Sequence, residues 1–338
     1  MKIGKLGEFG WIARVEQAVR HGEGVTTGIG DDAAVLDAGA DLELVATCDC
    51  QVEGVHFEPG WIEPRQLGHR LAAINLSDVA AMGARPRWAL ASLVAPPDTE
   101  ADRLEQVFAG LSEELGSAGA ALVGGNTARN AGALTIDLFL LGQVEQGRAL
   151  LRSNVRPRDA ICATGDLGAS RAGLIALQQP DLACDAEARD AVVARHLEPR
   201  ARLAEGRALL GAGVAACIDV SDGLVADAGH LAERSGVTIR IDAGLVPFSD
   251  ETAEVARAAG RDPLDLALAG GEDYELLFAV DGERVDEVVE AVRKASGTPV
   301  HRIGVAEAGD PGVIVERDGE RVDVEGRGFD HFSEKNTD

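Results

Sequence analysis

The residues in this sequence that are best suited to chemistry are aspartates placed at the ends of short apolar runs. Gly28-Ile-Gly-Asp-Asp-Ala-Ala-Val-Leu36 has the glycines of a phosphate-binding loop, yet it carries two aspartates where such a loop usually offers a lysine. Three further segments combine carboxylates with hydroxyl or amide groups: Thr47-Cys-Asp49, Asn75-Leu-Ser-Asp78 and Asp219-Val-Ser-Asp-Gly223. Ligands of α/β proteins bind at the carboxyl ends of strands, so we expect these segments to meet at one site.

Asp78 stands out because it falls on an apolar helix face. Residues 64–82 are predicted to form a helix, with a proline in the first turn and a glycine just past the end. One face of this helix carries residues that step by four, three and four: Leu67, Leu71, Ile74 and Asp78. Burying an isolated charge is costly, and no lysine or arginine shares that face within a turn. Two interpretations remain open, a salt bridge from elsewhere in the fold or a metal ion.

Dense carboxylates without basic partners favour magnesium. Mg²⁺ prefers carboxylates, water and substrate phosphates over sulfur, and a cation relieves the repulsion between neighbouring carboxylates. We therefore interpret the acidic turns as binding phosphate through several Mg²⁺ ions. The candidate ligands from these turns are Asp31 with its neighbour Asp32, Asp49, Asp78, Asp219 and Asp222.

Other groups near these turns are candidates for direct phosphate or substrate contact. Gly124-Gly-Asn-Thr127 follows an expected strand and could present backbone N–H groups to phosphate, although a plain turn fits equally well. Arg152 matches phosphate oxygens with two parallel N–H donors, and its alternative is a solvated arginine between domains. Gly270-Gly-Glu-Asp-Tyr274 is a second turn of glycines and acids. His56, taken alone, is better explained as a core or rim histidine.

The composition excludes several classes of protein. The chain has 338 residues, 46% hydrophobic and 26% charged, as expected for a globular protein of two domains. Its net charge of −25 repels nucleic acid and anionic lipid. No apolar run reaches about 18 residues, so we expect no membrane span. The five cysteines include no Cys-x-x-Cys pair and the first residues lack a signal-peptide pattern, so we expect a cytoplasmic protein.

Strands and helices are expected to alternate along the whole chain. The periodicity lapses and the composition turns basic near residues 147–159, where we place the junction between a domain of residues 1–148 and one of residues 149–338. Asp98 is expected to cap the helix that follows it. The predicted strands are 42–47, 87–94, 121–125, 133–144, 160–164, 215–219 and 274–280, and a further helix is predicted over 283–295.

Taken in order, these segments resemble the thiamine-monophosphate kinase family, within the ATP-using group that includes aminoimidazole ribonucleotide synthetase. The resemblance runs from Gly7-Glu-Phe9 to Gly328-Phe-Asp-His-Phe332. The motifs that carry it are Gly30-Asp-Asp-Ala-Ala34, Val52-Glu-Gly-Val-His-Phe57, Asn75-Leu-Ser-Asp-Val-Ala-Ala-Met-Gly-Ala84, Asp219-Val-Ser-Asp-Gly-Leu224 and Gly270-Gly-Glu-Asp-Tyr-Glu-Leu276.

The resemblance implies a function and an assembly. It implies Mg²⁺-assisted, in-line transfer of the γ-phosphoryl group of ATP to thiamine monophosphate, which is the last step of thiamine diphosphate biosynthesis. The implied fold is α/β (α+β): an amino-terminal mixed sheet with flanking helices that forms the interface of a homodimer, followed by a carboxy-terminal α/β sandwich.

The resemblance also implies roles for individual residues. Asp78, Asp219 and Arg152 are implied to be catalytic. Nucleotide-contacting positions are Gly125, Asn126, Arg152 and Ser221, and thiamine-contacting positions are His56, Phe329 and Glu272, or Asp273 in place of the last. Magnesium-binding positions are Asp31, Asp32, Thr47, Cys48, Asp49, Asp78, Asn126, Asp219 and Asp222.

Two positions depart from the family pattern. Asn126 stands where the family commonly has aspartate, so one metal is expected to bind more weakly or through water. Cys48 replaces a hydroxyl residue, and because thiolate is a poor ligand for Mg²⁺ we expect only its backbone carbonyl to take part.

Related enzymes and one other class remain as alternatives. Selenophosphate synthetases have a reactive cysteine near a glycine-rich amino terminus, whereas the first cysteine here is Cys48. Hydrogenase-maturation relatives end in cysteine, whereas this chain ends Lys-Asn-Thr-Asp. Aminoimidazole ribonucleotide synthetase is not excluded by motifs alone. A non-catalytic protein that binds metal or nucleotide is the alternative of a different class, and Asn126 gives it some support.

Overall fold

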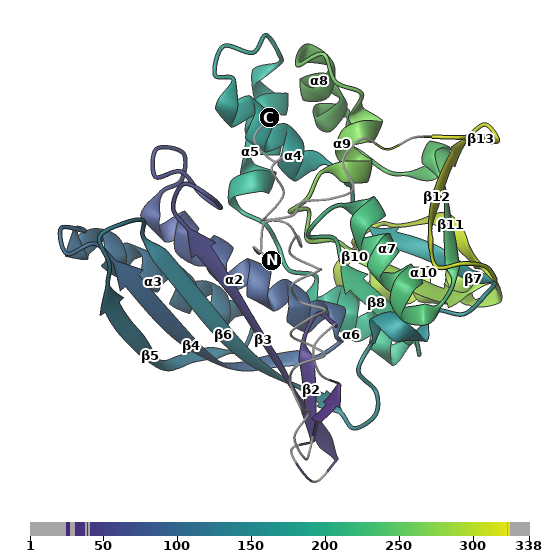
Figure 1. Cartoon of the computed structure of the whole chain (residues 1–338), viewed down its shortest axis with the longest axis horizontal. Helices are drawn as coiled ribbons and strands as arrows, with labels where there is room; N and C mark the ends of the chain where they lie inside the picture. The colour runs from purple at the N-terminus through teal and green to yellow at the C-terminus, as the bar shows by residue number, and fades with distance from the viewer. Residues whose placement is uncertain (1–24, 28–30, 38, 40, 323, 325–338) are drawn as a thin grey trace, which may run out of the picture.

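The first half of the chain forms a mixed six-stranded sheet with two helices on one face (Figure 1). The computed structural model describes residues 25–27, 31–37, 39, 41–322 and 324. The strand order is β1-β2-β3-β6-β4-β5. The elements are β1 (Val25–Thr27), β2 (Ala34–Asp37), β3 (Leu42–Val52), α2 (Pro64–Ala81), β4 (Arg85–Ala95), α3 (Ala101–Ser117), β5 (Ala121–Arg129) and β6 (Thr135–Glu145).

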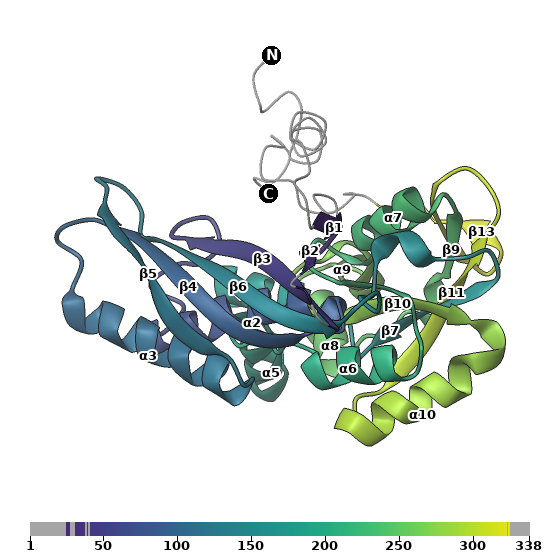
Figure 2. The same cartoon turned by 90° about the horizontal axis from the view of Figure 1, so that it is seen from below.

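Alternation along the strands divides this sheet into two different faces. Ala89, Ala91 and Leu93 of β4 are buried toward the helices, whereas the intervening Leu90 is 45% exposed. Leu90 lies opposite Phe139 of β6, which is 47% exposed. Figure 2 shows α3 along one face, while no helix of the described chain covers the other. The sheet therefore has one face in the core and one that is open.

Helix α2 lies at the centre of the molecule. Most of its residues are buried on every side, because it packs against β3 on one side and, on another, against α6 (Leu203–Gly211) and β8 (Ala216–Asp219) of the second half. Two glycines allow α3 to approach it: a Cβ on Gly68 would lie 1.9 Å from the Val107 carbonyl oxygen, and one on Gly110 would lie 2.0 Å from that of Arg65. The close crossing fixes the position of α2 and of the polar side chains that it carries.

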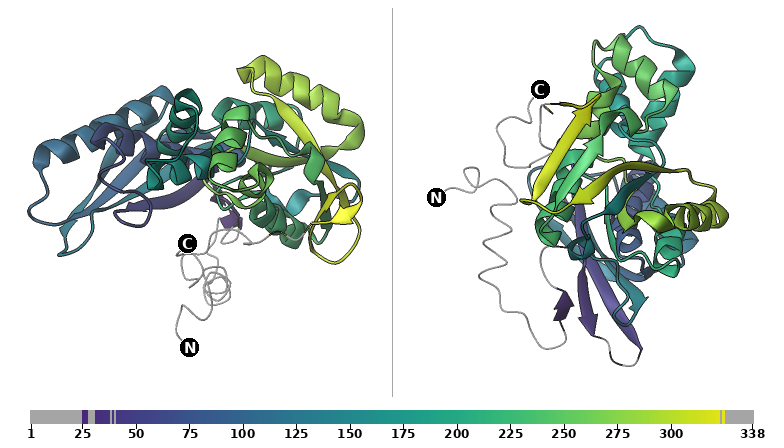
Figure 3. Two further views of the ribbon diagram at one scale, coloured as in Figure 1. Left: turned by 90° about the horizontal axis from the view of Figure 1, so that it is seen from above. Right: turned by 90° about the vertical axis from the view of Figure 1, so that its right-hand side faces the viewer.

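The second half is built on a sheet whose seven described strands have the order β13-β12-β9-β11-β7-β10-β8, and among these strands only β9 and β12 pair in parallel. Figure 3 shows this half beside the first, with β11 to β13 at the far end. Its elements are β7 (Asp159–Thr164), α4 (Ala169–Gln178), α5 (Ala186–Leu197), α6 (Leu203–Gly211), β8 (Ala216–Asp219), α7 (Leu224–Ser235), β9 (Thr238–Asp242), α8 (Asp250–Ala258), α9 (Pro263–Ala269), β10 (Leu276–Asp281), α10 (Val285–Ser296), β11 (Val300–Glu307), β12 (Gly312–Arg317) and β13 (Glu320–Arg321).

Helices cover both faces of the second sheet, which gives the expected α/β sandwich. Leu277 and Ile218 belong to a core beneath α7 and α9. Phe278 and Cys217, one residue along on the same strands, belong to the other core, which also contains Val292 of α10 and continues into residues of α2 and the first sheet. The two halves therefore share one hydrophobic core across α2.

Several predicted details are corrected by the structure. Asp98 does not cap α3, because the helix begins after Glu100. The strand expected from residue 274 begins at Leu276, because Tyr274 adopts a positive φ of 53° that interrupts an extended strand. Glycine-rich residues 124–127 are part of β5 and not a turn. No helix among the described residues is long and apolar enough to cross a membrane.

Candidate active site

Three carboxylates from both halves of the chain meet at the junction of the two sheets. One oxygen each from Asp32, Asp78 and Asp219 lies within 4.8 Å of the others. Asp32 precedes β2, Asp78 lies on α2 and Asp219 ends β8. The predicted aspartates of three separate segments are therefore brought together by the packing of α2 against β8.

Hydroxyl groups hold two of these carboxylates in place. Thr47 of β3 donates a hydrogen bond to Asp78, and Ser77 donates one of 2.6 Å to Asp219. Burial raises the pKa of Asp78 well above its usual value, and the negative charges of Asp49, Asp219 and Asp32 raise it further. Burial and the charge of Asp32 likewise raise the pKa of Asp219. The cluster is therefore a place where a positive charge would be bound favourably.

Arg152 supplies a positive charge at one edge of this cluster. Its Nη2 and Nε donate hydrogen bonds of 2.7 and 3.0 Å to the two oxygens of Asp32, a bidentate arrangement. Its backbone N–H donates to Asp31 at 3.1 Å. Burial, together with the charge of Asp32, raises the pKa of Asp31 to about 7. Arg152, which is predicted to bind phosphate, therefore lies at the carboxylate cluster. It forms its salt bridge with Asp32 and not with Asp78.

The alternation of β3 separates two neighbouring predicted ligands. Thr47 and Asp49 face α2, where the backbone N–H of Asp49 donates a 3.0 Å hydrogen bond to the side-chain oxygen of Asn75. Cys48 lies on the opposite face of the strand, where the partial burial of its thiol and the charge of Asp137 raise the pKa of that thiol to about 11. Its thiol therefore stays protonated and points away from the carboxylates, which leaves only its backbone for the predicted role.

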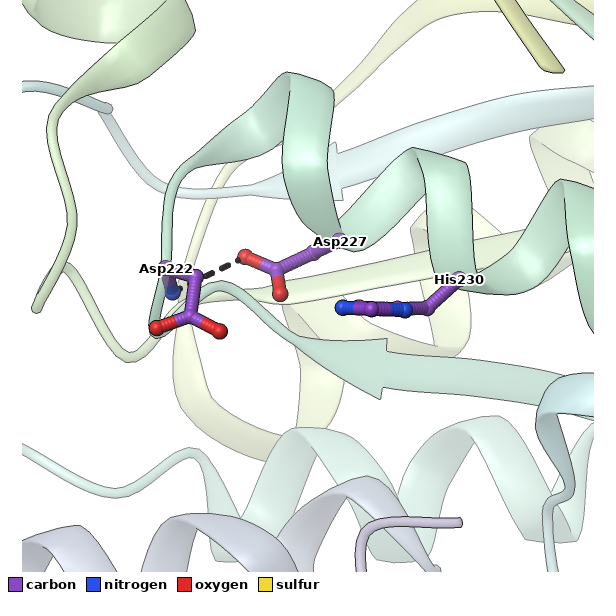
Figure 4. Close-up of side chains that lie close together, drawn as sticks. All are labelled: Asp222, Asp227 and His230. Atoms are coloured by element: carbon purple, nitrogen blue, oxygen red, sulfur yellow. Dashed lines mark hydrogen bonds between the residues drawn. The ribbon is translucent and has the colours of Figure 1, made fainter. Parts of the chain in front are cut away.

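A second group of possible ligands contains one of the predicted residues, Asp222, and two residues that the sequence analysis does not include. Figure 4 shows Asp222, Asp227 and His230 close together, and one ligand atom of each lies within 4.8 Å of the others. Asp227 accepts hydrogen bonds from the backbone N–H groups of Asp222 and Gly223, at 3.2 and 3.1 Å. The i, i+3 spacing of Asp227 and His230 on α7 is the sequence signal that could have found them.

Two nucleotide-contacting candidates lie away from the carboxylate cluster. Gly125 and Asn126 are exposed on β5, an edge strand, with β4 and β6 between it and β3. Strand spacing places β5 roughly 14 Å from β3. Asn126 is in register with Ser92, which opposes Asp137, so it lies on the open face of the sheet. Within one chain, the structure does not bring Asn126 to Asp78.

The loop before β10 gives different roles to two adjacent acids. Asp273 is buried and accepts hydrogen bonds from the N–H groups of Gly168 and Ser170, at 2.6 and 3.2 Å, at the start of α4. Burial raises its pKa to about 7. The Glu272 side chain is 30% exposed and pairs with Arg70. Glu272 is therefore the accessible one of the two substrate candidates.

Two of the remaining candidates, Ser221 and His56, lie among the residues that the structure describes, and the third lies outside them. The carbonyl oxygen of Ser221 accepts a 2.7 Å hydrogen bond from the Glu272 N–H, which places this residue beside the same loop. His56 Nδ1 accepts a 3.1 Å hydrogen bond from the Val52 N–H, which fixes the ring in a tight turn. Phe329 lies outside the described residues.

Comparison with known proteins agrees with the resemblance of the motifs. Residues 30–144 match the family model of the AIR synthase related protein N-terminal domain, and residues 156–316 match that of the C-terminal domain. The thiamine-monophosphate kinase of Escherichia coli (strain K12) is 40% identical over 328 residues, which cover 97% of this chain and 98% of the relative.

Solved structures give the same picture. The structure described as AaThiL complexed with AMPPCP and TMP has a TM-score of 0.85 and 35% identity, covering 98% of this chain and 99% of the other. Hydrogenase maturation protein HypE in complex with ATP has a TM-score of 0.68 at 22% identity, covering 87% of this chain and 88% of the other, and shares the fold alone. With this identity to the kinases over nearly the whole of both chains, the chain belongs to the thiamine-monophosphate kinase family of AIR synthase related proteins.

Proposed function

We propose that this protein transfers the terminal phosphoryl group of ATP to thiamine monophosphate and forms thiamine diphosphate. The observation that carries the proposal is the meeting of Asp32, Asp78 and Asp219 within 4.8 Å, at the junction of the two halves of a chain that belongs to this kinase family. The complex of AaThiL with AMPPCP and TMP supports ATP and thiamine monophosphate as the two substrates.

We propose that Mg²⁺ ions bind at the carboxylate cluster. The donor set fits, because it consists of carboxylate and hydroxyl oxygens without thiolates, and because burial, together with the repulsion between the carboxylates, raises the pKa of Asp78 and Asp219. The proposed ligands are Asp31, Asp32, Asp49, Asp78 and Asp219, with Asp222 beside them and backbone oxygens of Thr47 and Cys48. Bound Mg²⁺ neutralises the charge of phosphates that approach each other.

The protein's own groups are proposed to align the reactants. The phosphate of thiamine monophosphate is already anionic near neutral pH, so no strong general base is needed. Arg152 pairs with Asp32 in this structure and is proposed to share the developing charge of the transferred group by exchanging one carboxylate oxygen for a phosphate oxygen. Ser221 is proposed to contact the nucleotide, and Glu272, His56 and Phe329 the thiamine part.

We propose further that the chain forms a homodimer through the open face of its first sheet. Trp88, Leu90, Val123 and Phe139 are between 39% and 58% exposed, an apolar set that supports burial against another surface. Gly125 and Asn126 lie on the edge strand of the same sheet. A nucleotide role for these two residues requires that the interface bring them to a carboxylate cluster, or that the nucleotide reach across the sheet.

The remaining expectations stay proposals. A boundary between residues 148 and 149 falls between the two family-model matches, which end at residue 144 and begin at residue 156. A reducing cytoplasm is supported by the five cysteines, all of which are free thiols in the structure.

A coupled assay for thiamine diphosphate, with Mg²⁺ titrated from zero, tests the proposed function. The expected result is product formation that requires both ATP and Mg²⁺. Formylglycinamidine ribonucleotide offered in parallel distinguishes aminoimidazole ribonucleotide synthetase activity. ATP binding without any consumption that depends on thiamine monophosphate would favour the non-catalytic alternative and contradict the proposal.

A further inference from the structure

Arg70 is a fully buried cation for which the predicted site provides no role. It lies on α2 and is 1% exposed. Its Nε donates a 3.1 Å hydrogen bond to Gln51 Oε1 on β3, its Nη1 donates to the carbonyl oxygen of His196, and its Nη2 donates to Glu272. One side chain of the first half therefore reaches two segments of the second. A buried arginine needs a charged partner, and among the described residues Glu272 is the carboxylate paired with it.

The pair is asymmetric in exposure. The Arg70 side chain is 1% exposed and that of Glu272 is 30% exposed, so the arginine holds one side of a carboxylate whose other side is open. His196 Nδ1 lies 3.4 Å from the second Glu272 oxygen and 3.0 Å from the Ser170 hydroxyl. Burial lowers the pKa of His196 to about 4, so this imidazole is neutral near pH 7. Arg70 is therefore the cation that holds Glu272 through a direct ion pair, and the charge of Arg171 also acts on this carboxylate.

The backbone at Glu272 is held as tightly as its side chain. Glu272 adopts a φ of 65°, a region that costs free energy for a residue with a Cβ. Its N–H donates 2.7 Å to the carbonyl oxygen of Ser221, and a Cβ on Gly271 would lie 2.5 Å from the same oxygen. The carboxylate is therefore fixed by α2 on one side and by the loop that carries Ser221 on the other.

We infer that Arg70 is a positioning residue for the thiamine part of the substrate and acts through Glu272. The thiazolium ring of thiamine monophosphate is a permanent cation, and a carboxylate held at a fixed place with one open side attracts it with a defined orientation. ATP lacks such a cation, so Arg70 is expected to affect the phosphoryl acceptor and not the donor. This inference rests on the proposed function.

A double-mutant cycle tests the coupling. Arg70→Met and Glu272→Gln should each raise KM for thiamine monophosphate about tenfold or more, with KM for ATP unchanged within about twofold. KM for thiamine monophosphate in the double variant should equal that of Glu272→Gln alone within about twofold, because the arginine acts through that carboxylate. Arg70→Lys keeps the charge and should recover part of the loss. Arg65→Met, on the exposed side of the same helix, is the matched control and should change neither KM.

The outcomes separate the inference from the proposed function. Additive losses in the double variant, or equal rises in both KM values, would show that Arg70 has a general structural role and overturn the inference. If Arg70→Met does not fold, as judged by its thermal transition, the cycle is run with Arg70→Gln, which also removes the charge, and read in the same way. Calorimetric titration with thiamine monophosphate reports the same coupling without turnover. Wild-type protein that binds this ligand but forms no thiamine diphosphate would contradict the proposed function and leave the coupling measurable.

Discussion

At the scale of single residues, the aspartates of the carboxylate cluster make one another harder to ionise. Burial and neighbouring aspartates raise the pKa of both Asp78 and Asp219. Such an arrangement destabilises the folded state when no cation is bound, and a bound cation stabilises the folded state. These carboxylates therefore serve to bind cations and do not stabilise the fold by themselves.

Removing one of these charges should therefore separate activity from stability. Asp219→Asn is expected to lower kcat by about a hundredfold or more at saturating Mg²⁺, because one oxygen ligand with a full charge is lost. Its melting temperature without divalent cations should be equal to or above that of the wild type, because repulsion is relieved. Asp286→Asn, at an exposed position at the start of α10, is the control and should leave both quantities unchanged. Normal turnover of Asp219→Asn would remove Asp219 from the mechanism.

A buried acid outside the cluster gives a prediction about pH. Burial raises the pKa of Asp273 to about 7, above the value of an unfolded aspartate, so between these values the folded state binds more protons than the unfolded state. The contribution of Asp273 to the free energy of unfolding therefore falls as pH rises from about 4 through about 7, whereas His196 and His230, whose pKa values burial lowers to about 4, act in the opposite direction below the ordinary histidine pKa of about 6.5. Without divalent cations, the melting temperature should be lower at pH 8 than at pH 6, since Asp31 adds a shift of the same sign.

The variant Asp273→Asn isolates the contribution of this residue. Its melting temperature should fall less between pH 6 and pH 8 than that of the wild type, because the group that loses its proton is gone. Asp286→Asn again serves as the control. An unchanged difference between the two pH values would mean that Asp273 is not the group that titrates.

At the scale of elements, the site depends on where α2 lies, and the position of α2 depends on two glycines. Thr47, Asp49 and Gln51 alternate along one face of β3 and meet Asp78, Asn75 and Arg70 in reverse order along α2, so one strand–helix pair aligns three polar contacts. The crossing with α3 leaves no room for a Cβ at Gly68 or Gly110.

Enlarging one of these glycines should destabilise the fold. In Gly68→Ala the new Cβ would lie 1.9 Å from the Val107 carbonyl oxygen, so the helices must separate. This separation should lower the free energy of unfolding by about 1–3 kcal/mol or more. Gly116→Ala, also on a helix of this pair, meets nothing within 4 Å and should raise stability by up to about 1 kcal/mol through helix propensity. Urea denaturation of both variants measures the contrast. Equal stabilities would show that the helices adjust without cost.

At the scale of the whole molecule, the shared core and the open sheet face have different consequences. The core is continuous across α2, so the two halves of the chain pack against each other as one unit. This packing keeps Asp219 close to Asp78. The open face exposes Leu90 and Phe139 directly opposite each other, and this is the surface proposed to bind a second copy.

A charge placed on this face should separate the proposed dimer. Phe139→Asp is expected to convert a dimer to a monomer in light scattering coupled to gel filtration, because burying an unpaired carboxylate costs several kcal/mol. Val55→Asp, at a residue 58% exposed outside this sheet face, should leave the mass unchanged. A wild-type protein that is monomeric at micromolar concentration would contradict the proposed assembly.

The sequence by itself determined the elements and the chemistry of this protein. Helical periodicity located α2 and marked Asp78 as a polar residue on an apolar stripe, and apolar runs located most strands, because each signal is carried by residues close together in the chain. Residue types alone pointed to oxygen ligands and to phosphates, and the motifs in order pointed to the family that the comparisons show. The features that could be predicted are therefore those whose signals lie within a short stretch of the chain.

Only the tertiary structure decided which of those residues meet. Arg152 reaches Asp32, 120 residues away, and Arg70 crosses from one half to Glu272 in the other, 202 residues away. Asn126 lies on the open face of the first sheet, whereas the helix α2 that carries Asp78 covers the other face. Contacts at such separations depend on how α2 packs against both sheets, and a one-residue shift along β3 exchanges the roles of Cys48 and Asp49. Packing of the shared core selects one arrangement, and no local pattern encodes it.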